Sequence, residues 1–210
     1  MRLRRVKDAE KKILNHPEYI LNIPRGEHYP LNNAFKEDKP LRIEIGSGKG
    51  QFIHEMAKRH PEMNFIAIEK FDSAIVKILD KVLIEPLNNL YLVRMDAEFL
   101  KGCFKAKSVD KIYLNFSDPW PKVRHEKRRL THSDFLSIYQ EILKENGTIE
   151  LKTDNRKFFE YSIISMQKFG LSFDEISLDL HQDIEIDNIM TEFEEKFSKT
   201  GPIYKIMASF

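Results

Sequence analysis

Cysteine is nearly absent from this chain of 210 residues, and the single Cys103 cannot form an intramolecular disulfide. No pair of His or Cys residues has the HxxxH or CxxC spacing typical of zinc ligands. The sequence therefore predicts no bound metal, and it fits a reducing compartment.

Long apolar runs are also missing. No stretch approaches the ~18 apolar residues of a membrane-spanning helix, and no apolar segment follows the basic N-terminus as it would in a signal peptide. Internal repeats and low-complexity tracts are absent as well. We expect a soluble, cytoplasmic protein without membrane contact, either a monomer or a homodimer.

Hydrophobic residues make up 41% of the chain and charged residues 32%, which is enough apolar material for a core under a charged surface. The length fits one compact domain with an appended arm. Residues 1–40 contain four prolines and no sustained periodicity, so they are predicted to be a basic arm with little regular structure. Residues 41–210 then form the folded domain.

The formal net charge of +1 hides an uneven distribution. Residues 1–12 carry six basic and two acidic side chains, residues 122–129 carry five and one, and residues 171–200 carry two and nine. Such a polarised surface indicates a polyanionic partner, although solvated helix faces would produce the same pattern.

From residue 41 onward, short β-rich runs alternate with segments of helical periodicity. This alternation predicts a doubly wound α/β fold with a mostly parallel sheet of seven strands. The expected strands are 41–46, 64–69, 90–95, 111–116, 148–153, 172–180 and 203–210, and the expected helices lie at 53–60, 75–83, 135–142 and 155–169. Ligands of such sheets bind beyond the carboxyl ends of the strands.

The loop after the first of these strands is rich in glycine: Gly46, Gly48 and Gly50 follow Glu44. It lacks the third glycine of a dinucleotide fingerprint and the Ser or Thr of a P-loop. Acidic residues end the next two strands, Glu69 and Asp96, where a carboxylate can accept ribose hydroxyls or lie near an adenine edge, although each acid alone could be a helix cap. The combination favours S-adenosylmethionine over a nicotinamide or nucleotide ligand.

The loop after the fourth strand reads FSDPWPK, with Asp118 before Pro119. It leads directly into the basic segment, residues 122–129. Two prolines stiffen this loop, and lysine and arginine side chains neutralise phosphates. A nucleic-acid substrate is therefore favoured. Asp118 as a turn cap and Trp120 as a packing residue are the structural alternatives.

EIGSGKG, Glu69, Asp96, FSDPWPKVRHEKRRL, LKTDN and TEFE together resemble the bacterial tRNA (guanine-N7)-methyltransferase family over residues 41–210. The resemblance implies a Rossmann-like class I methyltransferase sheet with an antiparallel last strand, S-adenosylmethionine as methyl donor, and N7 of a guanosine in the tRNA variable loop, nucleotide 46, as target.

Carried over residue by residue, the resemblance implies Asp118 as the catalytic residue and three groups of binding residues. The cofactor contacts are Glu44, Gly46, Gly48, Gly50, Glu69, Asp96 and Asp118; the substrate contacts are Lys122, Asp154, Thr191, Glu192, Phe193 and Glu194; and the RNA-binding segment is Arg124, His125, Glu126, Lys127, Arg128 and Arg129. One departure is Phe193, where the family usually has Tyr.

Guanine N7 has a lone pair and no proton, so attack on a methyl group needs no prior deprotonation, and positioning should dominate catalysis. We expect the Asp118 carboxylate to stabilise the cationic product, and Asp154 and Glu194 to accept the guanine N1 and N2 protons. Trp120 or Phe193 could stack on the extruded base, or could simply pack in the core.

Three alternatives remain open from sequence. One is another S-adenosylmethionine-dependent enzyme that methylates an amino group, although such enzymes carry an (N/D)PP(Y/F/W) motif where this chain has DPWP. The others are a non-catalytic RNA-binding protein on a nucleotide-binding fold, and an oxidoreductase with a variant glycine loop.

Overall fold

The computed structural model describes residues 6–21, 23, 31–183 and 188–210. Part of the predicted basic arm, including Arg2, Arg4 and Arg5, lies outside these ranges. The chain divides into two compact units, residues 1–105 and 106–210, which are described in turn.

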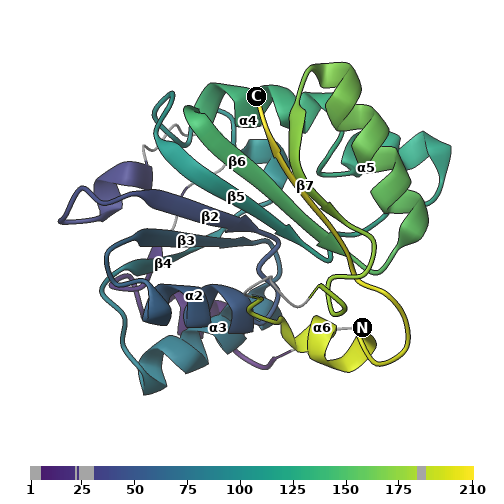
Figure 1. Cartoon of the computed structure of the whole chain (residues 1–210). Helices are drawn as coiled ribbons and strands as arrows, with labels where there is room; N and C mark the ends of the chain where they lie inside the picture. The colour runs from purple at the N-terminus through teal and green to yellow at the C-terminus, as the bar shows by residue number, and fades with distance from the viewer. Residues whose placement is uncertain (1–5, 22, 24–30, 184–187) are drawn as a thin grey trace. The chain divides into compact units, whose positions relative to one another are not determined.

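The first unit is a parallel sheet with the strand order β1-β4-β3-β2. Its strands are β1 (Ile20–Leu21), β2 (Leu41–Ile45), β3 (Asn64–Glu69) and β4 (Leu90–Arg94). All six residues of β3 are buried, as expected for an apolar strand in the middle of a parallel sheet. Helices α2 (Gln51–Arg59) and α3 (Asp72–Ile84) contact β3, and α3 also contacts β4 (Figure 1).

Residues before β2 form short elements around this sheet. Helix α1 (Ala9–Leu14) packs against α3, and Lys12 of α1 forms an ion pair with Asp80 of α3. The 3-10 helix η1 (Leu31–Ala34) is joined to the chain near η2 (Ala97–Phe99), because Leu31 N–H donates to the Cys103 carbonyl. The regular structure in the described part of residues 1–40 therefore consists of the two-residue β1 and of helices of one or two turns.

The second unit contains β5 (Val109–Asn115), β6 (Leu143–Thr153), β7 (Ser172–Ser177) and β8 (Tyr204–Ser209) in the order β5-β6-β8-β7. β5 and β6 are parallel, and β8 is antiparallel to both β6 and β7. Its helices are α4 (Ser133–Ile142), α5 (Arg156–Phe169) and α6 (Glu192–Phe197), with the 3-10 helix η3 (Val123–Arg128) after β5. α5 packs on β6 and β8.

The predicted fold class is confirmed: all seven predicted strands and all four predicted helices are present, and the last strand is antiparallel. An eighth strand, the two-residue β1, was not predicted because it is too short to show a period. β7 ends at Ser177, three residues before the predicted end, since Leu180 N–H donates instead to the carbonyl of Ile203.

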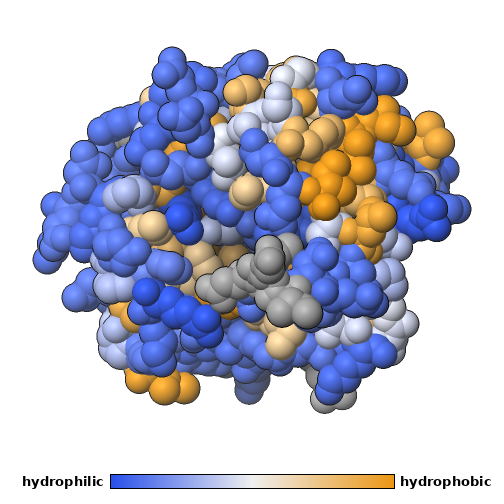
Figure 2. All heavy atoms as spheres, in the orientation of Figure 1, coloured by the Kyte–Doolittle hydropathy of each residue, from blue (hydrophilic) through white to orange (hydrophobic). Residues whose placement is uncertain are grey.

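Within the described residues, no helix has the length and apolar character needed to span a bilayer, and no group of three or more His, Cys, Asp or Glu side chains is placed to hold a metal ion. Hydrophilic side chains cover most of the face seen in Figure 2, as the high content of charged residues requires.

Candidate functional site

The glycine turn after β2 is shaped by backbone that other residues rarely adopt. Gly46, Gly48 and Gly50 have φ values of +80°, +55° and +77°. A Cβ added at Gly46 or Gly48 would meet nothing within 4 Å, whereas one at Gly50 would lie 2.6 Å from Ile78 Cγ2. The first two glycines thus leave open space beside the turn, and the third allows α2 to pack closely against α3.

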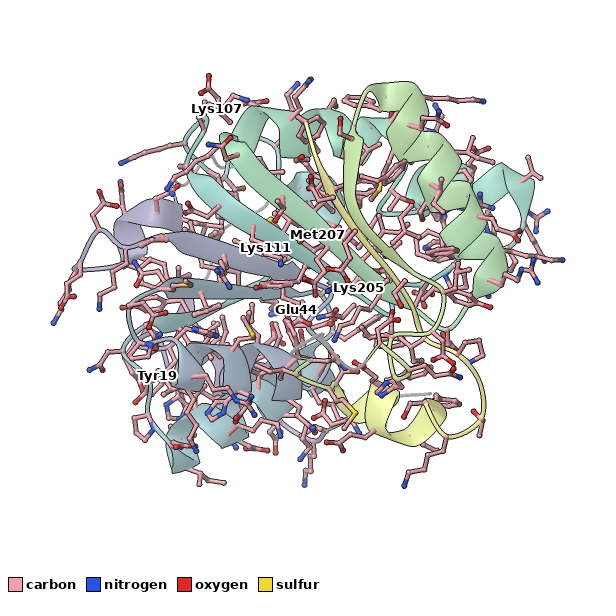
Figure 3. The ribbon with its side chains drawn as sticks, in the orientation of Figure 1. Tyr19, Glu44, Lys107, Lys111, Lys205 and Met207 are labelled. Atoms are coloured by element: carbon pink, nitrogen blue, oxygen red, sulfur yellow. The ribbon has the colours of Figure 1, made fainter. Side chains whose placement is uncertain are left out.

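The turn is tied to the neighbouring strand. The N–H groups of Gly46 and Ser47 both donate to the carbonyl of Ile68 in β3, at 2.8 and 3.1 Å, and Ser47 Oγ donates to the carbonyl of Glu44 at 3.1 Å. Glu44 is only 1% exposed, at the carboxyl end of β2 (Figure 3). The buried Glu44 side chain therefore lies directly before a turn that hydrogen bonds hold in place.

Glu69, the last residue of β3, holds the same turn from the other side. Its Oε2 accepts from Gly48 N–H at 2.9 Å, and its Oε1 accepts from the N–H groups of Lys70 and Phe71 at 2.8 and 2.9 Å. Burial raises the pKa of Glu69, and these three hydrogen bonds act against the increase. A carboxylate has about four acceptor positions, so one stays available for a ligand hydroxyl.

Asp96 follows β4 and caps η2 through a 3.4 Å hydrogen bond from Glu98 N–H, while Lys70 Nζ lies 3.4 Å from its other oxygen. Because β2, β3 and β4 are parallel neighbours, their carboxyl ends meet at one edge of the sheet of the first unit. The predicted acids Glu44, Glu69 and Asp96 are brought together at that edge, beside the glycine turn.

These residues fit S-adenosylmethionine. Gly46 and Gly48 leave room where a side chain would otherwise stand, and Glu69 keeps an acceptor position for a ribose hydroxyl. The turn lacks the Lys-Ser or Lys-Thr pair with which a P-loop binds a nucleoside triphosphate, since Gly50 follows Lys49.

In the second unit, the loop after β5 has an unusual backbone on both sides of Asp118. Phe116 and Trp120 have φ values of +51° and +41°, which side-chain-bearing residues rarely adopt. Phe116 N–H donates to the carbonyl of Lys152 at 2.8 Å, and the Arg129 guanidinium donates to the carbonyl of Trp120 at 3.1 and 3.3 Å. The loop is therefore held at both ends, and Asp118 between them is exposed.

The basic segment divides into two kinds of side chain. Arg129 is half-buried, with its guanidinium 4.2 Å from the centre of the Tyr161 ring. The same guanidinium donates to the Trp120 carbonyl and so has a structural role in the loop. Arg128 is exposed, but its guanidinium lies 4.9 Å from the centre of the Trp120 ring. The centres of the Trp120 and His125 rings lie 5.6 Å apart, with their planes nearly perpendicular. Lys122, Arg124 and Lys127 are exposed, while His125 and Glu126 are half-buried. Trp120 is thus partly covered by the segment that follows it.

Asp154 directly follows β6 and is exposed. Its neighbour Asn155 caps α5, accepting from Phe158 N–H at 2.9 Å, so the capping function belongs to Asn155 and leaves Asp154 for another role. Since β5 and β6 are parallel neighbours, Asp154 and the Asp118 loop lie at the same edge of the second unit.

The TEFE motif forms the start of α6 as a capping box, in which Thr191 Oγ1 accepts from Glu194 N–H at 3.0 Å. Phe193 is half-exposed, and its ring lies 4.9 Å from that of Phe116 and 4.1 Å from that of Phe197. Glu194 is completely buried, with its carboxylate hydrogen-bonded within the protein. Thr191 and Glu194 are therefore buried while Glu192 and Phe193 are partly exposed, a difference that the motif alone did not reveal.

Sequence reasoning missed Lys152, which is 1% exposed in β6 and forms an ion pair with Glu194 at 2.9 Å. The available signal was a lysine inside the otherwise buried run of β6, because an unpaired ammonium is very costly in a core. Asn188 and His181, which also contact Glu194, carried no such signal.

A cavity of about 510 Å³ lies elsewhere in the first unit, at the amino ends of β3 and β4. Asn64, Leu90, Tyr91 and Phe35 are among the residues that line it. It includes none of the predicted site residues.

The chain is similar to known methyltransferases. A family described as "Putative methyltransferase" matches residues 38–206. The tRNA (guanine-N(7)-)-methyltransferase of Lactiplantibacillus plantarum is 53% identical over 100% of this chain and 99% of its own, and that of Geobacillus kaustophilus is 50% identical over 96% and 93%. Among solved structures, a variant of the 16S rRNA (adenine(1408)-N(1))-methyltransferase of Catenulisporales acidiphilia, crystallised with the cosubstrate SAM, is 14% identical, covers 81% of this chain and 85% of its own, and has a TM-score of 0.60. That structure supports the fold.

Proposed function

Because the chain belongs to the tRNA (guanine-N7-)-methyltransferase family, we propose that its target is the guanosine at nucleotide 46 in the variable loop of tRNA. The protein is an enzyme that methylates guanine N7 in tRNA, with S-adenosylmethionine as methyl donor. The observation that carries this conclusion is about 50% identity over the whole chain to enzymes of that name. We propose a cytoplasmic location, which a tRNA substrate supports.

We assign the cofactor to the acidic edge of the first unit. Glu69, with one acceptor position left, would bind ribose hydroxyls; Glu44 and Asp96 flank it at the ends of β2 and β4. Gly46 and Gly48 would allow close approach of the ligand to the backbone, and Gly50 maintains the turn. The open space at the first two glycines supports this assignment.

When bound, S-adenosylmethionine supplies an electrophilic methyl group, to which N7 bonds while the sulfur retains the electron pair of the broken bond. Guanine N7 carries no proton, so no side chain has to act as a base before the transfer. The product purine is cationic, and a carboxylate held in place favours that charge more than the neutral base. We assign this role, together with a cofactor contact, to Asp118, because Asp118 is exposed and its loop is fixed at both ends.

We assign recognition of the guanine edge to Asp154, whose exposed carboxylate can accept the N1 and N2 protons. Phe193 is half-exposed beside Phe116 and could offer a stacking surface to an extruded base. The remaining proposed substrate contacts are Lys122, Thr191 and Glu192.

The exposed members of the basic segment would bind tRNA phosphates, since each cation that neutralises a phosphate releases a counterion. These are Arg124, Lys127 and Arg128, with His125 and Glu126 as polar neighbours in η3. Arg129 would act on RNA through the loop that it holds.

The proposal is tested with purified protein, unmodified tRNA transcript and labelled cofactor. N7-methylguanosine is mapped by reductive cleavage of the strand. We expect one cleavage site, at nucleotide 46, and no label in a matched transcript that carries adenosine there. Label at another position, or persistent label in the adenosine transcript, would contradict the proposed target.

A further inference from the structure

Two opposite charges are enclosed in the second unit with almost no exposure to solvent. Lys152 of β6 is 1% exposed and Glu194 of α6 is 0% exposed. The Lys152 Nζ lies 2.9 Å from Glu194 Oε2. Burying both ions is costly, so a buried ion pair is by itself weak evidence of added stability, whereas removal of one partner is strongly destabilising.

Every donor of the lysine is used. Besides Glu194, its Nζ donates to Asn188 Oδ1 and to the carbonyl of Ile189, both at 3.0 Å. An ammonium group has three N–H donors, so its hydrogen-bonding capacity is filled by one short stretch of chain and the start of α6. Lys152 therefore fastens residues 188–194 to β6.

The carboxylate is equally occupied. Glu194 Oε1 accepts from Asn188 Nδ2 at 2.6 Å and lies 3.1 Å from His181 Nε2, while Oε2 accepts from Lys152 and, at 3.5 Å, from Thr191 N–H. A guanine that hydrogen-bonded to this group would have to displace the buried ammonium of Lys152, the amide of Asn188 or the ring of His181. The carboxylate is thus directed inward rather than toward a ligand.

This ion pair connects the elements that carry the proposed substrate contacts. The Lys152 carbonyl accepts from Phe116 N–H at the start of the Asp118 loop, and Asp154 lies two residues after Lys152. Phe193, next to Glu194, packs its ring on Phe116. One buried pair therefore sets the relative position of the loop after β5, the end of β6 and the start of α6.

We propose that Lys152 and Glu194 are positioning residues for guanine recognition, and that Glu194 holds the Thr191–Phe193 segment in place without touching the base. The inference rests on the proposed function, because it concerns the same substrate. It leaves Asp154 as the carboxylate that meets the guanine edge.

The first test is rescue by a compensating variant. Lys152→Met removes the ammonium partner of the buried Glu194 carboxylate, and Glu194→Gln removes one carboxylate partner of the buried Lys152 ammonium, so each should lower kcat/KM for tRNA at least tenfold. The double variant Lys152→Met/Glu194→Gln has neither charge and should return to within about threefold of wild type. The KM for S-adenosylmethionine should stay unchanged in all three. A double variant as defective as Glu194→Gln would overturn the inference.

The second test uses a tRNA transcript with inosine in place of the target guanosine, which removes only the exocyclic N2 amino group and keeps N7. Wild-type enzyme should prefer guanosine by roughly tenfold, since an acceptor is left unpaired with inosine. The double variant should keep this preference, and Asp154→Asn should lose it. Loss of the preference in the double variant would show that Glu194 contacts the base.

The outcomes separate the two proposals. If wild-type enzyme does not methylate the guanosine transcript, the proposed target is wrong, whatever the variants do. If the wild type is active and Asp154→Asn keeps the preference for guanosine, the assignment of Asp154 fails, and so does this inference in its present form. The double variant uses neutral, shape-matched side chains, so its circular dichroism and thermal unfolding serve as the control for folding.

Discussion

Asp118 stands between two residues with left-handed backbone, Phe116 and Trp120. Each such residue costs about 1–2 kcal/mol relative to ordinary backbone. Hydrogen bonds from Phe116 N–H to the Lys152 carbonyl and from Arg129 to the Trp120 carbonyl help to offset that cost. A loop strained and fixed in this way holds the backbone from which the carboxylate projects, and such preorganisation favours electrostatic stabilisation of a developing cation.

We therefore expect Asp118→Ala to lower kcat on unmodified tRNA by about 10²–10³-fold, because a preorganised charge is lost. The side chain is exposed, so the unfolding free energy should change by less than about 0.5 kcal/mol. Turnover and urea denaturation are the measurements. Glu145→Gln, another exposed acid of the second unit, is the matched control and should keep full activity. Normal turnover in Asp118→Ala would exclude it from catalysis.

Gly50 differs from the other glycines of its turn in having no room for a side chain. An added Cβ would lie 2.6 Å from Ile78 Cγ2, at a φ of +77°. We expect Gly50→Ala to reduce the unfolding free energy by about 2–4 kcal/mol, from backbone strain and overpacking together. Gly48→Ala, with open space around its Cβ, should cost only about 1–2 kcal/mol. Denaturant titrations of the two variants check the difference, and equal losses would contradict it.

At the scale of an element, the 3-10 helix η3 carries exposed cations, which we propose bind RNA, and is followed directly by a cation with a structural role. Lys127 is exposed, whereas Arg129, directly after the helix, donates to the Trp120 carbonyl and stacks on Tyr161. Charge alone does not distinguish these two roles; burial and hydrogen bonding do.

Lys127→Ala should therefore reduce the dependence of tRNA affinity on salt by about one unit of the log–log slope and leave thermal stability unchanged. Arg129→Ala should in addition destabilise the protein by about 1–2 kcal/mol, since it removes a charged hydrogen bond and a cation–π contact. Filter binding at several salt concentrations and thermal unfolding measure both effects. An Arg129→Ala variant as stable as Lys127→Ala would show that the contacts in the loop are dispensable.

At the scale of the whole molecule, two buried carboxylates give opposite contributions to the pH dependence of stability. Burial raises the pKa of Glu69. Burial would also raise the pKa of Glu150, but the ammonium group of Lys111, 2.7 Å away, and the nearby Lys205 and Lys152 outweigh it, so that its pKa is lowered. Lys111 and Lys205 are labelled along the strands of the second unit in Figure 3.

The stabilisation from Glu150 is thus present above its unfolded pKa of 4.5 and lost as pH falls through the lower folded value. The contribution of Glu69 is present below pH 4.5 and lost as pH rises through the higher folded value. The unfolding free energy of Glu150→Gln should therefore fall further below that of wild type at about pH 7 than at about pH 4. The unfolding free energy of Glu69→Gln, relative to wild type, should instead increase as the pH rises from about 4 to about 7. Urea denaturation at both pH values measures this, and parallel trends in the two variants would contradict it.

Local patterns were sufficient for most of the fold and for the gathering of acidic residues at one edge of the first unit. Strands such as β3 and helices such as α3 have strong periodicity, and parallel strands necessarily bring Glu44, Glu69 and Asp96 to one edge. The two-residue β1 and the six-residue α6 are too short for a period to be visible, so local patterns could not show them.

The sequence by itself determined the fold class, the order of the strands along the chain and the family, because these depend on periodicity and on motifs that are contiguous in the chain. Only the tertiary structure decided which members of each motif face solvent. Glu194 and Asp154 are both acidic residues of a conspicuous motif. In the structure, Glu194 is buried in an ion pair with Lys152, whereas Asp154 is exposed. The physical reason is that burial and ion pairing depend on contacts between residues 42 positions apart, which no local pattern encodes.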